Sequence, residues 1–364
     1  MLFLNENNYA FGLDISDLTL KLIQLSKTKK GAKIQALGLA NLKKGTIQNG
    51  EIINAEEFLT SLRDLLKNPQ FGKIDSNKVV ASLPETKTFV KLATIHKSPN
   101  DLKNVIIKEV ESDFPLAIED VYYDWQIIKN YSDKMLVLIS AAPKKIVDQY
   151  TEILAGAGLD LVALEVEPAA ICRAILPEVD SKTTTKNYIV LDLGATRTGL
   201  TVYGQGSVIF TFSLPISGEK ITSDVATSLK ITKEIAEKSK LLYNVSKKDE
   251  DVIKEIINNQ LQDLTKRIYD AIEFYNQYFD AAGNINEIIL TGGGSNIKTI
   301  TADLKKTTNI KTTCGNLLTN IKNETTENIN KIMSDLYANK KYYKSNGLEF
   351  STAVGLALRG LNNE

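Results

Sequence analysis

NYIVLDLGATRTGLTVYG, residues Asn187–Gly204, is the stretch that decides the fold. The apolar run Tyr188–Leu193 predicts a buried strand, and the second apolar run predicts its antiparallel partner. The turn between them, Gly194–Gly199, follows a carboxylate, Asp192, and contains glycine and two threonines whose backbone N–H groups can face an anion. We therefore expect either an ordinary glycine-rich hairpin or a loop that holds a phosphate.

A segment near the N-terminus repeats this design. Tyr9–Leu25 reads YAFGLDISDLTLKLIQL, and its Leu-Asp-Ile around Asp14 matches the Leu-Asp-Leu around Asp192. Two such hairpins predict two similar domains that face each other across a cleft, and a nucleoside triphosphate is a suitable occupant of that cleft. The two carboxylates suit a hydrated Mg²⁺ ion, because Mg²⁺ prefers oxygen ligands and keeps several waters.

A glycine-rich segment follows later in the chain. Glu287–Ile300 reads EIILTGGGSNIKTI, which predicts a strand, three glycines and the polar start of a helix. A backbone without side chains allows an adenosine to approach closely, and a helix N-terminus favours negative charge.

These three segments, in this order, resemble the two phosphate loops and the adenosine motif of the actin-like ATPase superfamily. The resemblance implies an α/β fold of the actin-like ATPase type, in which two similar domains enclose a nucleotide cleft. It also implies ATP and Mg²⁺ as ligands, with Asp14 and Asp192 on the metal and with Asp192 and Glu167 as candidate catalytic residues. The residues that would hold the nucleotide are Asp14, Ser16, Asp17, Lys21, Gly194, Ala195, Thr196, Thr198, Glu237, Lys240, Gly292, Gly293, Gly294 and Ser295.

Some of these residues have an alternative interpretation. Glu167 opens a Glu-Pro-Ala-Ala sequence that resembles the first connecting helix of the superfamily, where an acidic or amide residue orients the attacking water; it could equally supply negative charge to its helix N-terminus. Glu237 and Lys240 share a helix face, as in the pair with which the superfamily's chaperones hold ribose and adenine, but a solvated ion pair is the ordinary alternative. Asp17 lies in Ser16–Leu18, where the superfamily usually has a glycine, and it adds negative charge near the phosphates. Lys21, on the same strand face, can compensate for this charge.

The segment Thr86–Leu164 has a different pattern from its surroundings and predicts an inserted module with the order β-α-β-β-α-β. Ser98 with Pro99 and Asp101 gives its first helix a capped start. An insertion at this point resembles the cell-division protein FtsA and, more closely, the PilM family of type IV pilus assembly proteins. The expected elements are Phe89–Ile95, Pro99–Phe114, Val121–Ile128, Met135–Ala141, Lys144–Ala157 and Leu159–Leu164.

The predicted organisation has five parts. They are a first actin-like domain (1–84), the inserted module (85–164), a connecting helix with a polar linker at Lys182–Asn187 (165–186), a second actin-like domain (187–347, with helices at about 216–284) and a C-terminal connecting helix (348–364). The polar stretch Leu318–Ser345 shows little apolar periodicity, so we expect a surface insertion there. Glu349–Leu361 has small residues that allow close helix packing and resembles the C-terminal signature of the PilM family.

Composition excludes several classes of function. The chain has 364 residues with 44 basic and 44 acidic side chains, so there is no electrostatic argument for nucleic acid or an anionic membrane. A single histidine, His96, gives no support to a histidine-based triad or metal site, and the two cysteines, Cys172 and Cys314, lack metal-type spacing. No run of about 18 apolar residues is present. We expect a cytoplasmic protein that reaches the inner face of the membrane through a partner.

The resemblance to the PilM family implies a nucleotide-bound scaffold of type IV pilus assembly. In that family the protein captures the short cytoplasmic tail of the inner-membrane protein PilN, and contact with pilus motor ATPases is also implied. The alternatives are a filament protein of the FtsA type and an ATPase or phosphotransferase of the same fold. FtsA binds membranes through a C-terminal amphipathic helix, which this sequence does not show, and Glu167 alone as a water-orienting residue predicts at most slow hydrolysis.

Overall fold

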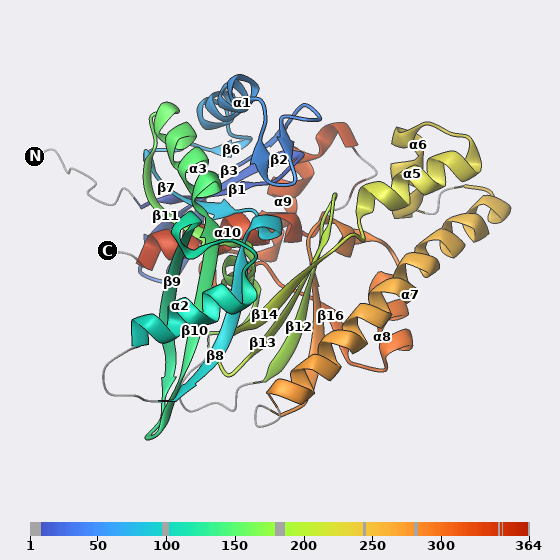
Figure 1. Ribbon diagram of the computed structural model, residues 1–364. Coiled ribbons are helices and arrows are strands. Elements are labelled where there is room, and N and C mark those ends of the chain that lie inside the picture. Colours follow the sequence, from blue (N-terminus) through green and yellow to red (C-terminus); the bar gives the residue numbers. More distant parts are fainter. Residues whose placement is uncertain are drawn as a thin grey trace, which may run out of the picture.

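The computed structural model describes residues 9–96, 102–178, 186–242, 245–279, 283–340, 343 and 345–362. Two large sheets carry the two halves of the molecule, and helices α4 (Glu167–Ile175) and α10 (Ser351–Asn362) lie between them (Figure 1). One apolar cluster joins the two sheets through these helices, because it contains Ile23 from the first sheet, Val190 from the second and Ala353 from α10. The expected α/β architecture of two domains is therefore confirmed.

The first sheet has the strand order β11-β7-β1-β2-β3-β6. β1 and β2 form the first predicted hairpin, and β7 runs parallel to β1. Helices α1 (Ala55–Lys67) and α3 (Lys144–Gly156) share a core cluster with this sheet, to which they contribute Phe58 and Tyr150. The strands are β1 Phe11–Ile15, β2 Thr19–Thr28, β3 Gly31–Asn41, β6 Phe71–Gly72, β7 Lys78–Leu83 and β11 Asp160–Val166, with a separate small hairpin of β4 Ile47–Gln48 and β5 Glu51–Ile52.

The second sheet has the order β16-β15-β12-β13-β14-β8-β10-β9. β12 and β13 form the second predicted hairpin, and β15 runs parallel to β12. The long helix α7 (Lys247–Tyr278) buries a stripe that includes Ile253, Ile257 and Leu264 in the core cluster that this sheet contributes to, as its spacing predicts. The strands are β8 Phe89–His96, β9 Val121–Asn130, β10 Lys134–Pro143, β12 Asn187–Leu193, β13 Thr198–Gly204, β14 Ser207–Leu214, β15 Ile285–Thr291 and β16 Thr312–Cys314, and the other helices of this half are α5 Gly218–Leu229, α6 Lys233–Leu242 and α8 Ile300–Thr308.

The six elements expected between Phe89 and Leu164 are present in the expected order, but they are divided between the two sheets. β11 pairs in parallel with β7, so it belongs to the first sheet, and α3 covers that sheet. The compact inserted subdomain is therefore β8, α2 (Leu102–Asp113), β10 and β9. It extends the second sheet, because Lys91 of β8 pairs with Phe210 of β14.

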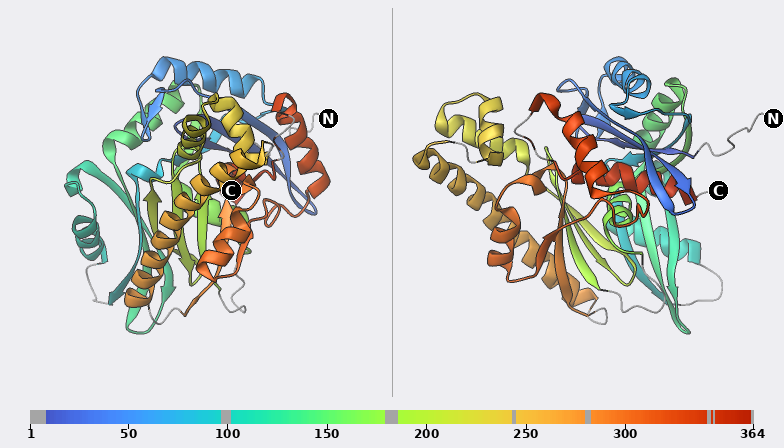
Figure 2. Two further views of the ribbon diagram at one scale, coloured as in Figure 1. Left: turned by 90° about the vertical axis from the view of Figure 1, so that its right-hand side faces the viewer. Right: turned by 180° about the vertical axis from the view of Figure 1, so that it is seen from behind.

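The expectation of a surface insertion at Leu318–Ser345 is wrong. Helix α9 (Thr326–Leu336) lies in this stretch and buries Ile329, Ile332 and Met333 in the cluster shared by the two sheets. Seen from behind in Figure 2, it lies beside the first sheet. These three apolar residues lie on one face of the helix and are enough to bury it. The polar residues around them make the helical period hard to recognise when a longer stretch is considered.

The two connecting helices cross at backbone contact. A Cβ atom on Gly355 of α10 would lie 1.8 Å from the carbonyl oxygen of Ala170 in α4, so only glycine fits there. Arg173 of α4 and Arg359 of α10 both pair with the buried carboxylate of Glu165, at 3.2 Å for Arg359. This contact fixes α4 and α10 to each other between the two sheets.

Two sequence predictions fall outside the described residues. These are the start of the first inserted helix, at Ser98–Asp101, and most of the linker Lys182–Asn187. No helix in the described part of the chain is both long enough and apolar enough to cross a membrane.

Candidate nucleotide-binding site

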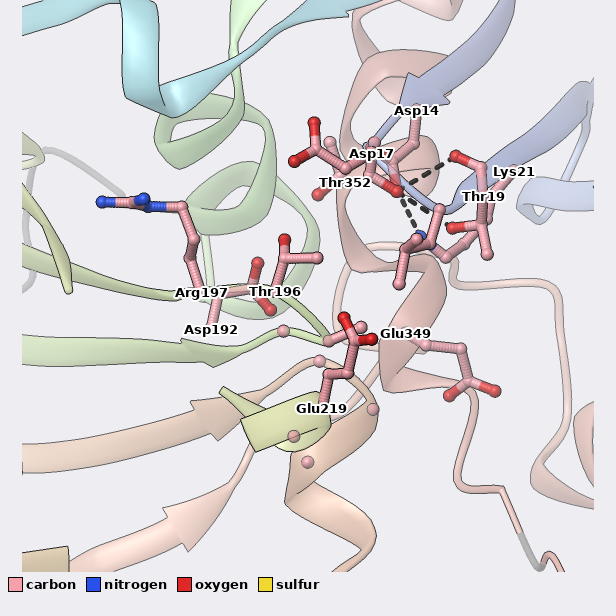
Figure 3. A pocket seen from close by; sticks show the side chains of 18 of the residues that line it. Asp14, Asp17, Thr19, Lys21, Asp192, Thr196, Arg197, Glu219, Glu349 and Thr352 are labelled. Carbon is pink, nitrogen blue, oxygen red and sulfur yellow. Dashed lines mark hydrogen bonds and ion pairs between the residues drawn. The ribbon is translucent and has the colours of Figure 1, made fainter. Parts of the chain in front are cut away.

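A cavity of about 680 Å³ lies between the two hairpins and is lined by both halves of the molecule. Its size is typical of a site for a small molecule or cofactor. Figure 3 shows Asp14 and Lys21 on one side of it and Asp192, Thr196 and Arg197 on the other. The predicted site residues that line it are Asp14, Ser16, Asp17, Lys21, Glu167, Asp192, Gly194, Ala195, Thr196, Glu237, Lys240, Gly292, Gly293 and Gly294.

Two predicted residues do not line this cavity. The hydroxyl of Thr198 donates to the carbonyl of Ile216 at 2.7 Å, and the hydroxyl of Ser295 donates to the carbonyl of Gly292 at 2.7 Å. Both side chains are buried, and their hydroxyls support nearby backbone: Thr198 the connection between β14 and α5, and Ser295 the glycine motif itself. The sequence identified these loops correctly but could not show which hydroxyls the loops use internally.

The first hairpin carries its own cation. The Nζ atom of Lys21 lies 2.7 Å from the Asp14 carboxylate, and both side chains are largely buried. Burial alone would lower the pKa of Lys21, but the charge and hydrogen bond of Asp14, with the charges of Asp192 and Glu349, raise it above its ordinary value. This lysine therefore stays charged and offsets Asp14.

The carboxylate of Asp17 has partners of its own. It accepts hydrogen bonds from the backbone N–H groups of Asn49 at 3.2 Å and Gly50 at 3.0 Å, in the turn between β4 and β5. Asn49 and Gly50 both have positive φ angles, as this tight turn requires. Asp17 thus fastens that turn to the first phosphate loop, and the two N–H groups offset part of the negative charge that its sequence position suggests.

The second hairpin presents its carboxylate differently. Burial, and after it the charge of Asp14, raises the pKa of Asp192 to about 6, although Lys21 acts in the opposite direction. Gly292 packs so closely that a Cβ atom there would lie 2.3 Å from Asp192 Oδ1, and its φ of 77° is one that glycine adopts readily. The glycine motif therefore meets the second phosphate loop directly, beside a carboxylate whose environment favours a cation.

Two further carboxylates line the same cavity. Burial, followed by the charges of Asp14, Glu85 and Asp192, raises the pKa of Glu167 well above its ordinary value. Glu85, which the sequence analysis missed, has its pKa raised to about 8 by burial and then by Asp192, and its Oε1 atom is buried without a hydrogen-bond partner in the described structure. The sequence does contain an indication that Glu85 belongs to the site. Glu85 and Pro84 directly follow the carboxyl end of a buried parallel strand, where binding residues often lie.

The pair Glu237 and Lys240 is not a solvated ion pair. Lys240 is buried, lies 2.6 Å from Glu237, and also donates to the Thr222 hydroxyl at 3.0 Å and the Gly218 carbonyl at 3.2 Å. The lysine is thus held against the start of α5, at the cavity wall. Lining residues that the sequence analysis did not propose include Thr86, Arg197, Glu219, Thr222, Tyr337, Asn339, Tyr343, Glu349 and Thr352.

The residues present fit a hydrated magnesium ion better than a metal held by protein alone. Asp14 and Asp192 come from opposed hairpins, and each disfavours the charge of the other unless a cation lies nearby. Within the described ranges no three or more His, Cys, Asp or Glu side chains form a metal-binding group. Mg²⁺ does not need such a group, because water and phosphate oxygens complete its coordination.

A family model described as type IV pilus assembly protein PilM matches residues 12–361. The chain belongs to this family. The solved structure of a PilM-PilN type IV pilus biogenesis complex matches 97% of this chain and 98% of that chain, with a TM-score of 0.77 and 24% identity. The resemblance to PilM that the inserted module and the C-terminal segment Glu349–Leu361 suggest is therefore confirmed.

More distant proteins share the fold. FtsA of Bacillus subtilis strain 168 is 22% identical over 335 residues, which cover 80% of this chain and 74% of FtsA. For FtsA of Streptococcus pneumoniae serotype 2 the identity is 21%, and the match spans only 56% of that protein. MreB5 of Spiroplasma citri bound to AMPPNP aligns with a TM-score of 0.54 over 92% of this chain and at 14% identity. FtsA is thus a distant relative, and these matches support the actin-like fold.

Proposed function

We propose that this protein is a nucleotide-bound scaffold of type IV pilus assembly, which binds Mg-ATP in its cleft and the cytoplasmic tail of a PilN-like inner-membrane protein. The observation that carries the nucleotide part is the cavity in which two phosphate hairpins, a glycine motif and a buried lysine meet. Membership of the PilM family, together with the solved PilM-PilN complex, supports the partner. The partner would place this cytoplasmic protein at the inner face of the membrane, where it would contact the pilus motor ATPases.

The cavity offers each part of Mg-ATP a matching group. The backbone of Gly194–Thr196 and the hydroxyl of Ser16 would contact the phosphates, while Glu237 and Lys240 would hold the ribose and base beside the glycine motif. Mg²⁺, held by Asp14 and Asp192, would neutralise charge on the phosphates. We expect slow hydrolysis, below about 1 per second, because Glu167 is the one residue that the sequence suggests for orienting the attacking water.

Calorimetry with Mg-ATP tests the nucleotide part. Asp192→Ala should weaken binding about tenfold or more, since it removes one charged contact worth about 1.5–3 kcal/mol. Asp224→Ala is a suitable control, because this partly exposed helix residue lies outside the cavity and pairs with Lys220. Absence of binding to the unaltered protein would refute the proposal.

The partner peptide has a suitable surface on the inserted subdomain. β9 is the edge strand of the second sheet, and its Tyr122 and Ile127 are exposed. An extended peptide can add to such an edge through backbone hydrogen bonds, with side-chain contacts at alternate positions. β11, the edge of the first sheet, exposes Val162 and is the competing surface. We place the tail peptide on β9, in the inserted part of the chain.

Two matched charge substitutions distinguish the edges. Ile127→Asp should lower the affinity for a synthetic PilN-like tail peptide about tenfold, whereas Val162→Asp should leave it unchanged. Both residues are exposed apolar side chains on edge strands, so neither change should unfold the protein. The opposite result would place the peptide on β11, and no effect of either change would place it on neither edge. Deleting Thr86–Leu164 is unsuitable as a test, because it would remove β11 and α3 from the first sheet.

A further inference from the structure

The short segment Pro84–Thr86 lies between β7 of the first sheet and β8 of the inserted subdomain and contacts the turn that joins β4 to β5. A Cβ atom on Gly50 would lie 2.4 Å from Pro84, and the Thr86 hydroxyl donates to the Asn49 carbonyl at 3.0 Å. The N–H groups of the same two turn residues donate to Asp17. Through this turn, Pro84–Thr86 is attached to the first phosphate loop.

The middle residue of the segment, Glu85, reaches the second hairpin. A Cβ atom on Gly199 would lie 2.9 Å from Glu85 Oε2 and 3.1 Å from Oε1, so the carboxyl group rests on the backbone of β13. Gly199 is the residue that pairs with Asp192 across the hairpin. Glu85 therefore belongs to the first domain by sequence but lies against the second phosphate loop, with one buried oxygen unpaired in the described structure.

The same segment leads directly into the strand that supports the proposed peptide edge. β8 begins at Phe89 and pairs with β10, and β10 pairs with β9. β8 also touches the second sheet at the pair of Lys91 with Phe210. Glu85 thus lies a few residues before a strand that has a neighbour on each side, β10 and β14.

We propose that Pro84–Thr86 couples the phosphate end of the cleft to the inserted subdomain, with Glu85 as the positioning residue. This inference rests on the proposed function, because it assumes that Mg-ATP binds in the cleft. Phosphates and their magnesium ion would change the electrostatic field at Glu85, on whose pKa the charges of Asp192 and Arg197 act in opposite directions. A ligand shifts such an equilibrium only through different interactions with the two arrangements, and a buried carboxyl group beside the ligand supplies that difference.

Hydrogen exchange of the full chain, with and without a concentration of Mg-ATP that saturates each variant, tests the coupling. In the unaltered protein, Mg-ATP should slow exchange in β8 and β10 about fivefold or more, the lower range of measured couplings. Glu85→Gln, which removes the ionisable group at nearly constant shape, should abolish this slowing. Gly199→Ala, whose new methyl group would displace the Glu85 side chain from the hairpin side, should abolish it as well.

A control separates coupling from general effects on the subdomain. Glu119→Gln changes an exposed carboxylate of the same subdomain and should keep the slowing. Slowing that persists in both Glu85→Gln and Gly199→Ala, or Mg-ATP binding without any slowing in the unaltered protein, would overturn the coupling and leave the proposed function intact. Failure of the unaltered protein to bind Mg-ATP in calorimetry would overturn both.

Discussion

The hairpins that carry Asp14 and Asp192 share one design but differ in how far the charges of their carboxylates are compensated. In the first, Asp14 is paired with Lys21 at 2.7 Å and Asp17 accepts two backbone hydrogen bonds, so its charges have partners within the first domain. In the second, the half-buried Asp192 lies beside Gly292 with its pKa raised to about 6, and the Nε atom of Arg197 donates to Ser213 at 2.7 Å. The second hairpin therefore keeps an electrostatic cost that a bound cation would remove. Sequence similarity between two loops does not make them equivalent in the folded protein.

The largest expected loss of stability follows from breaking the ion pair between Lys21 and Asp14 in the first hairpin. Lys21→Met leaves Asp14 buried without its cation, and breaking a buried pair from one side costs about 3–5 kcal/mol. Denaturant unfolding of the nucleotide-free protein should show this loss. Lys220→Met, which removes a lysine from an exposed pair with Asp224, is the matched control and should change stability by less than about 1 kcal/mol. Equal effects of the two substitutions would contradict the assignment.

The next effect concerns the contact of the glycine motif with the second hairpin. Gly292→Ala should destabilise the protein by about 2–4 kcal/mol, because alanine is strained at this positive φ and its methyl group would clash with Asp192 and Leu193. Gly293→Ala should have little effect on stability, since its Cβ atom would meet only the Tyr343 hydroxyl, at 3.8 Å. Thermal unfolding of the two variants gives the comparison, and a reversed order would disprove the close approach.

The smallest expected effect is a gain in stability. Without ligand, Asp192→Asn should stabilise the protein by about 1–2 kcal/mol at pH 7, because it removes a half-buried carboxylate whose pKa is raised to about 6. In the unaltered protein, the folded state binds more protons at Asp192 than the unfolded state does between the ordinary carboxyl pKa and about 6. The contribution of protonated Asp192 to stability is therefore present at low pH and is lost as the pH rises through that window.

The difference in stability between Asp192→Asn and the unaltered protein should depend on pH. The stability gain of Asp192→Asn over the unaltered protein should be near zero at about pH 4, grow towards pH 6 and stay constant above pH 7. Calorimetric unfolding across this range measures it. A gain that is independent of pH would show that Asp192 is not electrostatically strained, and the contrast between the hairpins would fail.

The sequence predicted the elements of the site well where local pattern determines position. Asp14 and Asp192 lie near the ends of two strands and Gly292–Gly294 follow a third, and the order and direction of these strands bring the three motifs to one cavity. Glu85 was missed because its role depends on contact with Gly199, more than a hundred positions away and in another domain. The sheet membership of β11 was missed for a similar reason, since its pairing with β7 spans the whole inserted subdomain.

Helix α10 has a consequence for how this protein is made. It follows β7 by more than 250 positions, yet it packs against β1, β2 and β7, and Gly360 and Gly12 bring its backbone against the N-terminal strand region. On the ribosome, the inner face of the first sheet therefore stays uncovered until residues 351–362 have left the exit tunnel. The strands of the first sheet cannot complete their core while they are the only part of the chain that has been synthesised.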